Sequence, residues 1–155
     1  MIEEIRIRGL GVIDDAVLEP HPGFTAVTGE TGAGKTMVLT GLSLLLGGRA
    51  DPAVVRGDRA EIEGRVSAPP ASVVERVLEA GGDLDDGVVV LARTVASEGR
   101  SRAFVGGRSV PVSVLGELSH DLVAVHGRAT SNGCSHRHVS ARRSIASRAT
   151  RWPNR

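Results

Sequence analysis

The octapeptide GETGAGKT, residues 29–36, sets the architecture that we expect for this chain. It meets the full pattern G-x-x-x-x-G-K-[ST], which marks a phosphate-binding loop when a strand precedes it and a helix follows it. FTAVT at 24–28 has the short, apolar and β-branched character of a strand. KTMVLTGLSLLL at 35–46 is apolar on most sides, as a buried helix is. The sequence therefore predicts strand, loop and helix in that order.

Each residue type in the octapeptide has a physical reason. Glycines let the backbone curl until successive N–H groups point at phosphate oxygens, and the helix N-terminus adds its partial positive charge. Lys35 is the only lysine among the 19 basic residues, and its compact ammonium suits a narrow phosphate loop where a planar guanidinium does not fit. We therefore expect a nucleotide and Mg²⁺ as ligands, with Thr36 also on the metal. The expected binding residues are Gly29, Glu30, Thr31, Gly32, Ala33, Gly34, Lys35 and Thr36.

The rest of the chain mixes strands with helices. Period-two alternation or short apolar runs predict strands, and Gly106-Gly107 predicts a hairpin turn between two of them. Together these elements predict an α/β fold with a mixed sheet, antiparallel near the N-terminus. Besides 24–28, the expected strands are 2–8, 12–19, 60–67, 88–95, 102–105, 109–112 and 121–127, and the expected helical segments besides 35–46 are 71–82 and 113–119.

Charge is distributed unevenly along the chain. Residues 1–127 carry 12 basic and 18 acidic residues, a net charge of −6, whereas residues 128–155 carry seven arginines and no acidic residue. A single cysteine, Cys134, excludes an internal disulfide and fits a reducing cytosol. The N-terminus resembles no signal or transit peptide, and the longest apolar stretch is far below the about 20 residues of a membrane span. We expect a cytoplasmic protein with no membrane partner.

Catalysis needs more than a phosphate loop. A P-loop NTPase also uses a second carboxylate near Mg²⁺ and a group that orients the attacking water. No apolar run here ends in Asp or Glu in the manner of that carboxylate. Asp85 and Asp86 fit a solvated turn, Glu30 fits a capping or contact role, and His126 fits a packed end of a strand. We assign no catalytic residue from the sequence.

The stretch FTAVTGETGAGKTMVLTGLSLLLGGRADPAVVRGD at 24–58 resembles the N-terminal head segment of RecN-type DNA repair ATPases, in the SMC-like branch of the ABC ATPases. IRIRGLGVIDDAVLE at 5–19, RSRAFVGGRSVPVSVLGEL at 100–118 and LVAVHG at 122–127 resemble the same family in the same order. The resemblance covers about 1–127. It implies the N-terminal lobe of a divided ATPase head that carries the Walker A motif.

The resemblance also implies partners. In this family the signature motif, the Walker B carboxylates and the switch histidine come from a C-terminal lobe, and two heads close on ATP in a process coupled to DNA binding and double-strand break repair. We therefore expect a truncated, hydrolysis-incompetent ATP-binding portion. The alternative is a stand-alone small P-loop nucleotide-binding protein or kinase, which would need its own lid and its own Mg²⁺ carboxylate. Arg100, Arg102 and Arg108 either face DNA phosphates or form a solvated hairpin face.

The chain departs from the family at residue 128. The family reads VHGQ, whose Gln lies near Mg²⁺ and the attacking water, but this chain has VHGR. The guanidinium of Arg128 has no acceptor for a water or metal interaction, so the Gln role does not carry over. Residues 128–155 are rich in Arg, Ser and Ala and contain no Leu, Asp, Glu or Lys. One interpretation is a disordered basic arm that binds nucleic acid.

We favour a second interpretation, in which residues 128–155 are an out-of-frame translation. If each new codon takes the last base of one codon and the first two bases of the next, positions 129 onward can be read as DQQRLLTPARQRAAVDRFAGDAVAEP. This string regains leucines and acidic residues and resembles the continuation of the family. Loss of one A from a CAG codon would produce Arg128 and start the shift. We therefore expect no stable packing in this tail and no metal site at Cys134, His136 and His138.

Resequencing the gene tests this interpretation. We expect the base that restores family-like text to be missing at codon 128, because the out-of-frame text begins there. An intact reading frame on both sides of codon 128, with no RecN-like text in the alternative frame, would rule the frameshift out.

Overall fold

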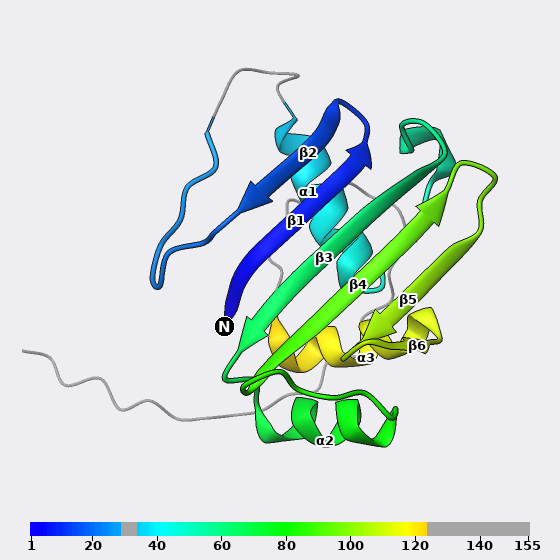
Figure 1. The fold of residues 1–155 in the computed structure, drawn as a ribbon. Helices are drawn as coiled ribbons and strands as arrows, with labels where there is room; N and C mark the ends of the chain where they lie inside the picture. Colours follow the sequence, from blue (N-terminus) through cyan, green and yellow to red (C-terminus); the bar gives the residue numbers. More distant parts are fainter. Residues whose placement is uncertain (29–33, 124–155) are drawn as a thin grey trace, which may run out of the picture. The chain divides into compact units, whose positions relative to one another are not determined.

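The computed structural model describes residues 1–28 and 34–123, and the predictions that fall on 29–33 and 124–155 lie outside this part of the chain. The described strands form a six-stranded sheet in the order β2-β1-β3-β4-β5-β6, and every neighbouring pair is antiparallel (Figure 1). The strands are β1 (Ile2–Leu10), β2 (Ile13–Leu18), β3 (Arg59–Ser67), β4 (Val88–Ala96), β5 (Ser101–Val105) and β6 (Arg108–Val110).

The helices of the described residues lie on one side of this sheet. Helix α1 (Lys35–Leu45) crosses behind β1, β3 and β4, α3 (Val112–Leu122) lies behind β5, and α2 (Ala71–Glu79) packs against α3 (Figure 1). A short 3₁₀ helix, η1 (Pro52–Val54), lies between α1 and β3 in the chain. The other face of the sheet carries no helix of the described residues, so strands need apolar side chains on only one side.

The core follows from the period of two along the strands. In β4 every second residue is buried, and the same alternation runs through the centre of β3. Leucines and valines of the three helices close this layer from the other side. The apolar residues that are almost fully buried are Ile7, Leu10, Leu44, Leu45, Ala60, Ile62, Val66, Val73, Val77, Val89, Leu91, Val95, Ala103, Val105, Leu115 and Leu118.

Two tight turns confirm the turn predictions. The N–H of Val88 donates to the carbonyl of Asp85 at 2.8 Å, and Asp86 and Gly87 between them have positive φ angles of 48° and 78°. Two successive positive φ angles define the hairpin turn that suits the twist of antiparallel strands. Asp85 and Asp86 are exposed in this turn, as a solvated loop requires. Gly106-Gly107 joins β5 to β6 with the same signature.

Two strand predictions are wrong in the described residues. Residues 24–28 form no strand, and Phe24 and Val27 are 91% and 53% exposed. A strand requires a hydrogen-bonded neighbour, and no described strand pairs with this apolar run. Residues 121–122, expected to open a strand, instead end α3, because Leu115, Leu118 and Leu122 follow helical spacing and short apolar runs suit both periods.

The α/β class is confirmed, with smaller differences. A mixed sheet needs a parallel pair, and the described strands form none. The second helix ends at Glu79 rather than at 82, because Gly81 takes a φ of +75° that ends a helix. The segment 113–119 belongs to a longer helix, α3.

Glycines bring α1 unusually close to the sheet. A Cβ atom at Gly41 of α1 would stand 2.7 Å from Cδ1 of Ile7, and one at Gly64 of β3 would stand 2.5 Å from Cδ2 of Leu45. Both distances are far below van der Waals contact. The helix therefore rests on the sheet at two points where only a hydrogen atom fits.

Replacement of Gly64 tests this contact. Gly64→Val should lower the free energy of unfolding by about 1–3 kcal/mol, because overpacking pushes Leu45 and α1 away from the sheet. Gly116→Ala is the matched control, since nothing lies within 4 Å of the added Cβ, and alanine in a helix should stabilise by about 0.5–1 kcal/mol. Urea unfolding measures both. An unchanged urea midpoint for Gly64→Val would show that the space at Gly64 does not limit how closely α1 packs on the sheet.

Candidate nucleotide-binding site

Helix α1 begins at Lys35, directly after Gly34. Gly34 stands at its N-cap with a φ of +93°, a left-handed conformation that glycine adopts without strain. The N–H of Val38 donates to the carbonyl of Gly34 at 3.0 Å, which closes the first turn. No described side chain caps this end, and the first turn holds no acidic residue. The first N–H groups of a helix lack partners within the helix, and the helix dipole is positive there.

A pocket of about 380 Å³ lies beside this helix end. Its walls come from three places in the chain: the turn between β1 and β2, the first turn of α1, and η1. Thr36 is exposed and Lys35 is half-buried. The described residues that line the pocket are Gly11, Val12, Gly34, Lys35, Thr36, Met37, Ala53 and Val54.

Backbone hydrogen bonds hold these walls together. The N–H of Gly11 donates to the carbonyl of Val54 at 2.7 Å, and the N–H of Arg56 donates to the carbonyl of Gly9 at 2.8 Å. Gly11 has a φ of +56°, and a Cβ atom there would stand 2.3 Å from Sδ of Met37. Glycine at this position adopts the positive φ without strain and leaves room for the Met37 side chain of α1.

The structure brings three of the predicted ligand residues together. Gly34, Lys35 and Thr36 line one pocket, whereas Gly29 to Ala33 lie outside the described residues. The predictions for His126, Arg128 and the tail also fall outside. Among the described residues, no group of three His, Cys, Asp or Glu side chains is placed to hold a metal ion. The Mg²⁺ role of Thr36 stays a prediction.

The fold of the described residues matches the N-terminal lobe of SMC-like ATPase heads. A family model described as an AAA domain matches residues 4–99. The chain is 63% identical over 132 residues to the DNA repair protein RecN of Streptomyces coelicolor, a match that covers 83% of this chain and 23% of that protein. The chain thus spans about a quarter of the length of this relative.

Solved structures agree with this assignment at the level of the fold. One, from work on ATP-driven dimerization and DNA-stimulated activation of SMC ATPases, aligns with a TM-score of 0.62 at 21% identity over 77% of this chain and 78% of the other. The recombination mediator RecF with ATP aligns with a TM-score of 0.56 at 18% identity over 76% of this chain and 30% of RecF. The chain belongs to the AAA domain family, as an N-terminal segment of the RecN and SMC-like ATPase type.

Arg93 is a buried charge that the sequence analysis missed. It is 3% exposed, on the core-facing side of β4. The signal was present in VVVLARTV, since Arg93 shares the parity of the apolar residues Val89, Leu91 and Val95. Burial lowers the pKa of its guanidinium.

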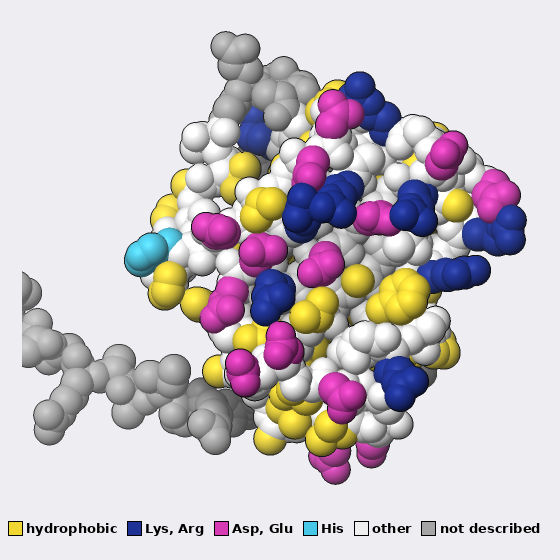
Figure 2. All heavy atoms as spheres, in the orientation of Figure 1, with side chains coloured by type: hydrophobic (Ala, Val, Ile, Leu, Met, Phe, Trp, Pro, Cys, Tyr) yellow, Lys and Arg dark blue, Asp and Glu magenta, His cyan; other side chains and the backbone are white. Residues whose placement is uncertain are grey.

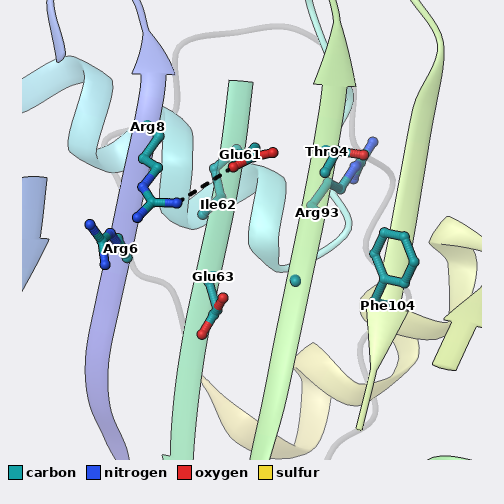
Figure 3. A pocket seen from close by; sticks show the side chains of 9 residues that line it. Arg6, Arg8, Glu61, Ile62, Glu63, Arg93, Thr94 and Phe104 are labelled. Atoms are coloured by element: carbon teal, nitrogen blue, oxygen red, sulfur yellow. Dashed lines mark ion pairs between the residues drawn. The ribbon is translucent and has the colours of Figure 1, made fainter. Parts of the chain in front are cut away.

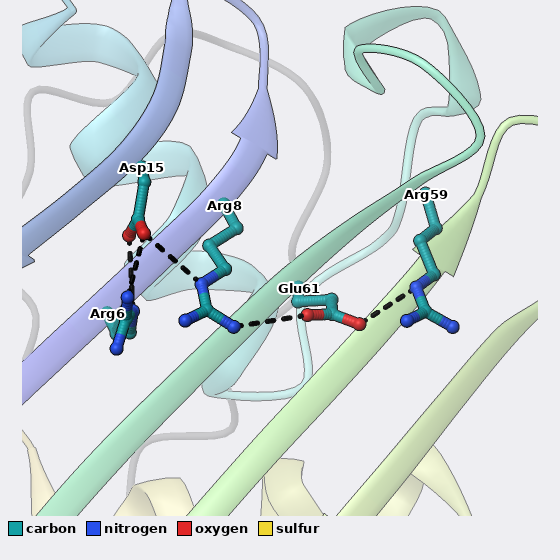
Figure 4. Close-up of polar contacts among 5 residues, drawn as sticks. All are labelled: Arg6, Arg8, Asp15, Arg59 and Glu61. Carbon is teal, nitrogen blue, oxygen red and sulfur yellow. Dashed lines mark hydrogen bonds and ion pairs between the residues drawn. The ribbon is translucent and has the colours of Figure 1, made fainter.

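The open face of the sheet carries charges of both signs (Figure 2). An ion-pair ladder crosses three strands (Figure 4): Asp15 contacts Arg6 at 2.7 Å and Arg8 at 3.4 Å, and Glu61 contacts Arg8 at 3.8 Å and Arg59 at 2.8 Å. These residues face one another because the strand register sets Arg8 between Asp15 and Glu61. Alternating charges on neighbouring strands stabilise the sheet modestly.

A hollow of about 240 Å³ on this face lies among Arg6, Glu61, Glu63 and Phe104 (Figure 3). Its lining mixes acidic and basic side chains, so it presents no single charge to a ligand. Two of the three hairpin arginines already have partners: Arg100 contacts Glu98 at 2.6 Å, and Arg108 donates to the carbonyl of Gly81 at 2.9 Å. Arg102 makes no ion pair within the described residues. A DNA-facing role for the three arginines stays a prediction.

Among the described residues, no helix is long and apolar enough to cross a membrane.

The Arg6–Asp15 pair predicts a pH dependence. The pKa of Asp15 lies below its ordinary value because the Arg6 guanidinium donates hydrogen bonds to the carboxylate. A lowered pKa adds stability above the ordinary pKa, and this stability is lost as the pH falls through the folded-state pKa. Asp15→Asn should therefore lower the urea midpoint slightly at pH 7, and its difference from the parent should vanish as the pH falls from about 5 toward about 2.

The control for this measurement is Glu19→Gln, because Glu19 is exposed and makes no ion pair with the described residues. It should leave the urea midpoint unchanged at both ends of the pH range. A difference between Asp15→Asn and the parent that persists at pH 2 would contradict the pairing.

Proposed function

We propose that this chain is the ATP-binding portion of a RecN-like cytoplasmic protein that acts in DNA double-strand break repair and recombination. The observation that carries the proposal is the pocket at the N-terminus of α1, lined by Gly34, Lys35 and Thr36. The identity to RecN over most of the chain supports this interpretation over a stand-alone kinase. The RecF structure that aligns with this chain is a RecF–ATP structure, which supports the same nucleotide here.

The residues present fit a nucleotide bound with Mg²⁺. The first turn of α1 and the left-handed Gly34 would present backbone N–H groups to phosphate oxygens. Lys35 would contact the β- and γ-phosphates, and the hydroxyl oxygen of Thr36 would coordinate Mg²⁺. The apolar side chains of Val12, Met37 and Val54 line the same pocket and suit the planar adenine base of ATP. Bound Mg²⁺ would neutralise part of the phosphate charge.

Turnover needs groups that this pocket does not supply from its described lining. No described residue that lines it carries a carboxylate, and phosphoryl transfer requires one near Mg²⁺. We therefore propose that the chain binds ATP without hydrolysing it at an enzymatic rate. Dimerization driven by ATP in SMC ATPases supports a second head as the partner of the longer relatives, with DNA as their substrate.

Replacement of Lys35 tests the binding role. Lys35→Ala should weaken ATP binding in the presence of Mg²⁺ about 10- to 100-fold, because a hydrogen bond to a charged group contributes about 1.5–3 kcal/mol. Titration calorimetry on the full chain measures the affinity. Arg102→Ala is the control, because it removes one positive charge on the opposite face of the sheet and should leave the affinity unchanged.

Two outcomes would contradict the proposal. Equal ATP affinity for Lys35→Ala and the parent would remove the role assigned to Lys35. Steady-state turnover by the parent on the order of 1 s⁻¹ or faster, the range of ordinary enzymes, would favour the stand-alone kinase instead.

A further inference from the structure

Arg93 ties four parts of the described chain together. It extends from β4 into the core, where its Nη1 donates to the carbonyl of Leu44 at 3.1 Å and to the carbonyl of Gly48 at 2.9 Å. Its Nε donates to Oγ of Ser101, the first residue of β5, at 2.9 Å. One guanidinium thus contacts the last turn of α1, the connection that follows it, and a neighbouring strand.

The charge of Arg93 is balanced by dipoles rather than by an acid. No carboxylate of the described residues lies within ion-pair distance of it, and its acceptors are two carbonyls and a hydroxyl. The carbonyls at the end of α1 carry the negative end of the helix dipole, which favours a cation there. A methionine would fill similar space without the desolvation cost of a buried charge. Apolar burial alone therefore does not require an arginine at this position. Its hydrogen bonds to the end of α1 indicate a role in placing that helix.

Hydrogen bonds add to apolar packing in fixing the position of α1 on the sheet. The contacts of Gly41 with Ile7 and of Leu45 with Gly64 determine how close the helix lies to the sheet and also restrict its sliding. The hydrogen bonds of Arg93 are directional, and they end at fixed carbonyls. An 11-residue helix is about 16 Å long, so a shift at Leu44 is carried to Lys35.

The same side chain contacts the connection that leads from α1 to η1, the second wall of the pocket. Gly48 lies in the connection from α1 to η1, and η1 contributes Ala53 and Val54 to the pocket. The N–H of Gly48 donates to the carbonyl of Ser43 at 2.8 Å, so this connection starts from a defined point on the helix. Arg93 therefore holds the end of α1 and the start of the η1 connection against one strand.

We propose that Arg93 is a positioning residue for the nucleotide site: it sets the place of α1 along the sheet, and with it the place of Lys35 and Thr36 relative to the η1 wall. The inference rests on the proposed function only in taking ATP as the ligand. It deepens that function, because it assigns the geometry of the nucleotide site to a buried side chain that neither lines the pocket nor belongs to the motif at 29–36.

The test uses the full chain with Arg93→Met, which keeps an unbranched apolar side chain but removes the donors, and Arg93→Lys, which keeps the charge but not the fork. Arg102→Met on the open face is the matched control. Two-dimensional NMR reports the amide signals of Gly34, Thr36 and Met37, calorimetry reports ATP–Mg²⁺ affinity, and urea unfolding reports the folded fraction.

Arg93→Met, while folded, should move the amide signals at the start of α1 and weaken ATP binding at least tenfold. Arg93→Lys should recover part of the parent's amide signal positions and part of its ATP affinity, because an ammonium can reach one carbonyl. Arg102→Met should change neither. A purely structural role would lower the unfolding midpoint without moving signals about 10–15 Å along the helix from Leu44.

Three results would overturn the assignment. The first is a folded Arg93→Met protein whose amide signals at Gly34, Thr36 and Met37 match those of the parent. The second is unfolding of both Arg93 variants, which would make Arg93 a support of the whole fold. The third is an equal displacement of these signals by Arg102→Met. If the parent binds no ATP, the proposed function fails, but the amide signals still decide the role of Arg93.

Discussion

The close seat of α1 on the antiparallel sheet is the constraint on which the described structure depends. At Gly41 and Gly64 a single added carbon would collide with Ile7 or Leu45, so the helix has one depth at which the core closes. Apolar burial drives this contact. The directional hydrogen bonds of Arg93 add a second restraint on the position of the helix. Depth and axial position together determine where the first turn of α1 lies.

The two faces of the sheet have different roles. One face buries alternate apolar residues beneath the helices, and the other alternates Arg6, Arg8 and Arg59 with Asp15 and Glu61. Because opposite charges are paired across strands, the open face adds register and solubility without a strong field of one sign. The proposed anion-binding site lies instead at the N-terminus of α1, where the positive end of the helix dipole lies beside Lys35 and Thr36. This separation supports a nucleotide as the ligand of the described segment.

The site is assembled from segments that are distant in the sequence. The β1–β2 turn, the first turn of α1 and η1 each contribute one wall, and hydrogen bonds such as that from Gly11 to Val54 join them. None of these walls is a pocket alone. The similarity to RecN and to SMC-like heads is therefore reflected in an arrangement of backbone as well as in a motif.

Local patterns determined much of this protein: the alternation in β1, β3 and β4, the turn glycines, and the motif ending in Lys35 and Thr36 could be read from the sequence, because each depends on neighbours in the chain. Tertiary structure decided the rest. The apolar run at 24–28 forms no strand, since strand formation depends on a partner that local sequence does not reveal. Asp121 and Leu122 joined α3 because burial selected the helical period. Local sequence did not distinguish Arg93 from the other strand arginines. Only the fold places it beneath the end of α1, where carbonyl dipoles stabilise its charge.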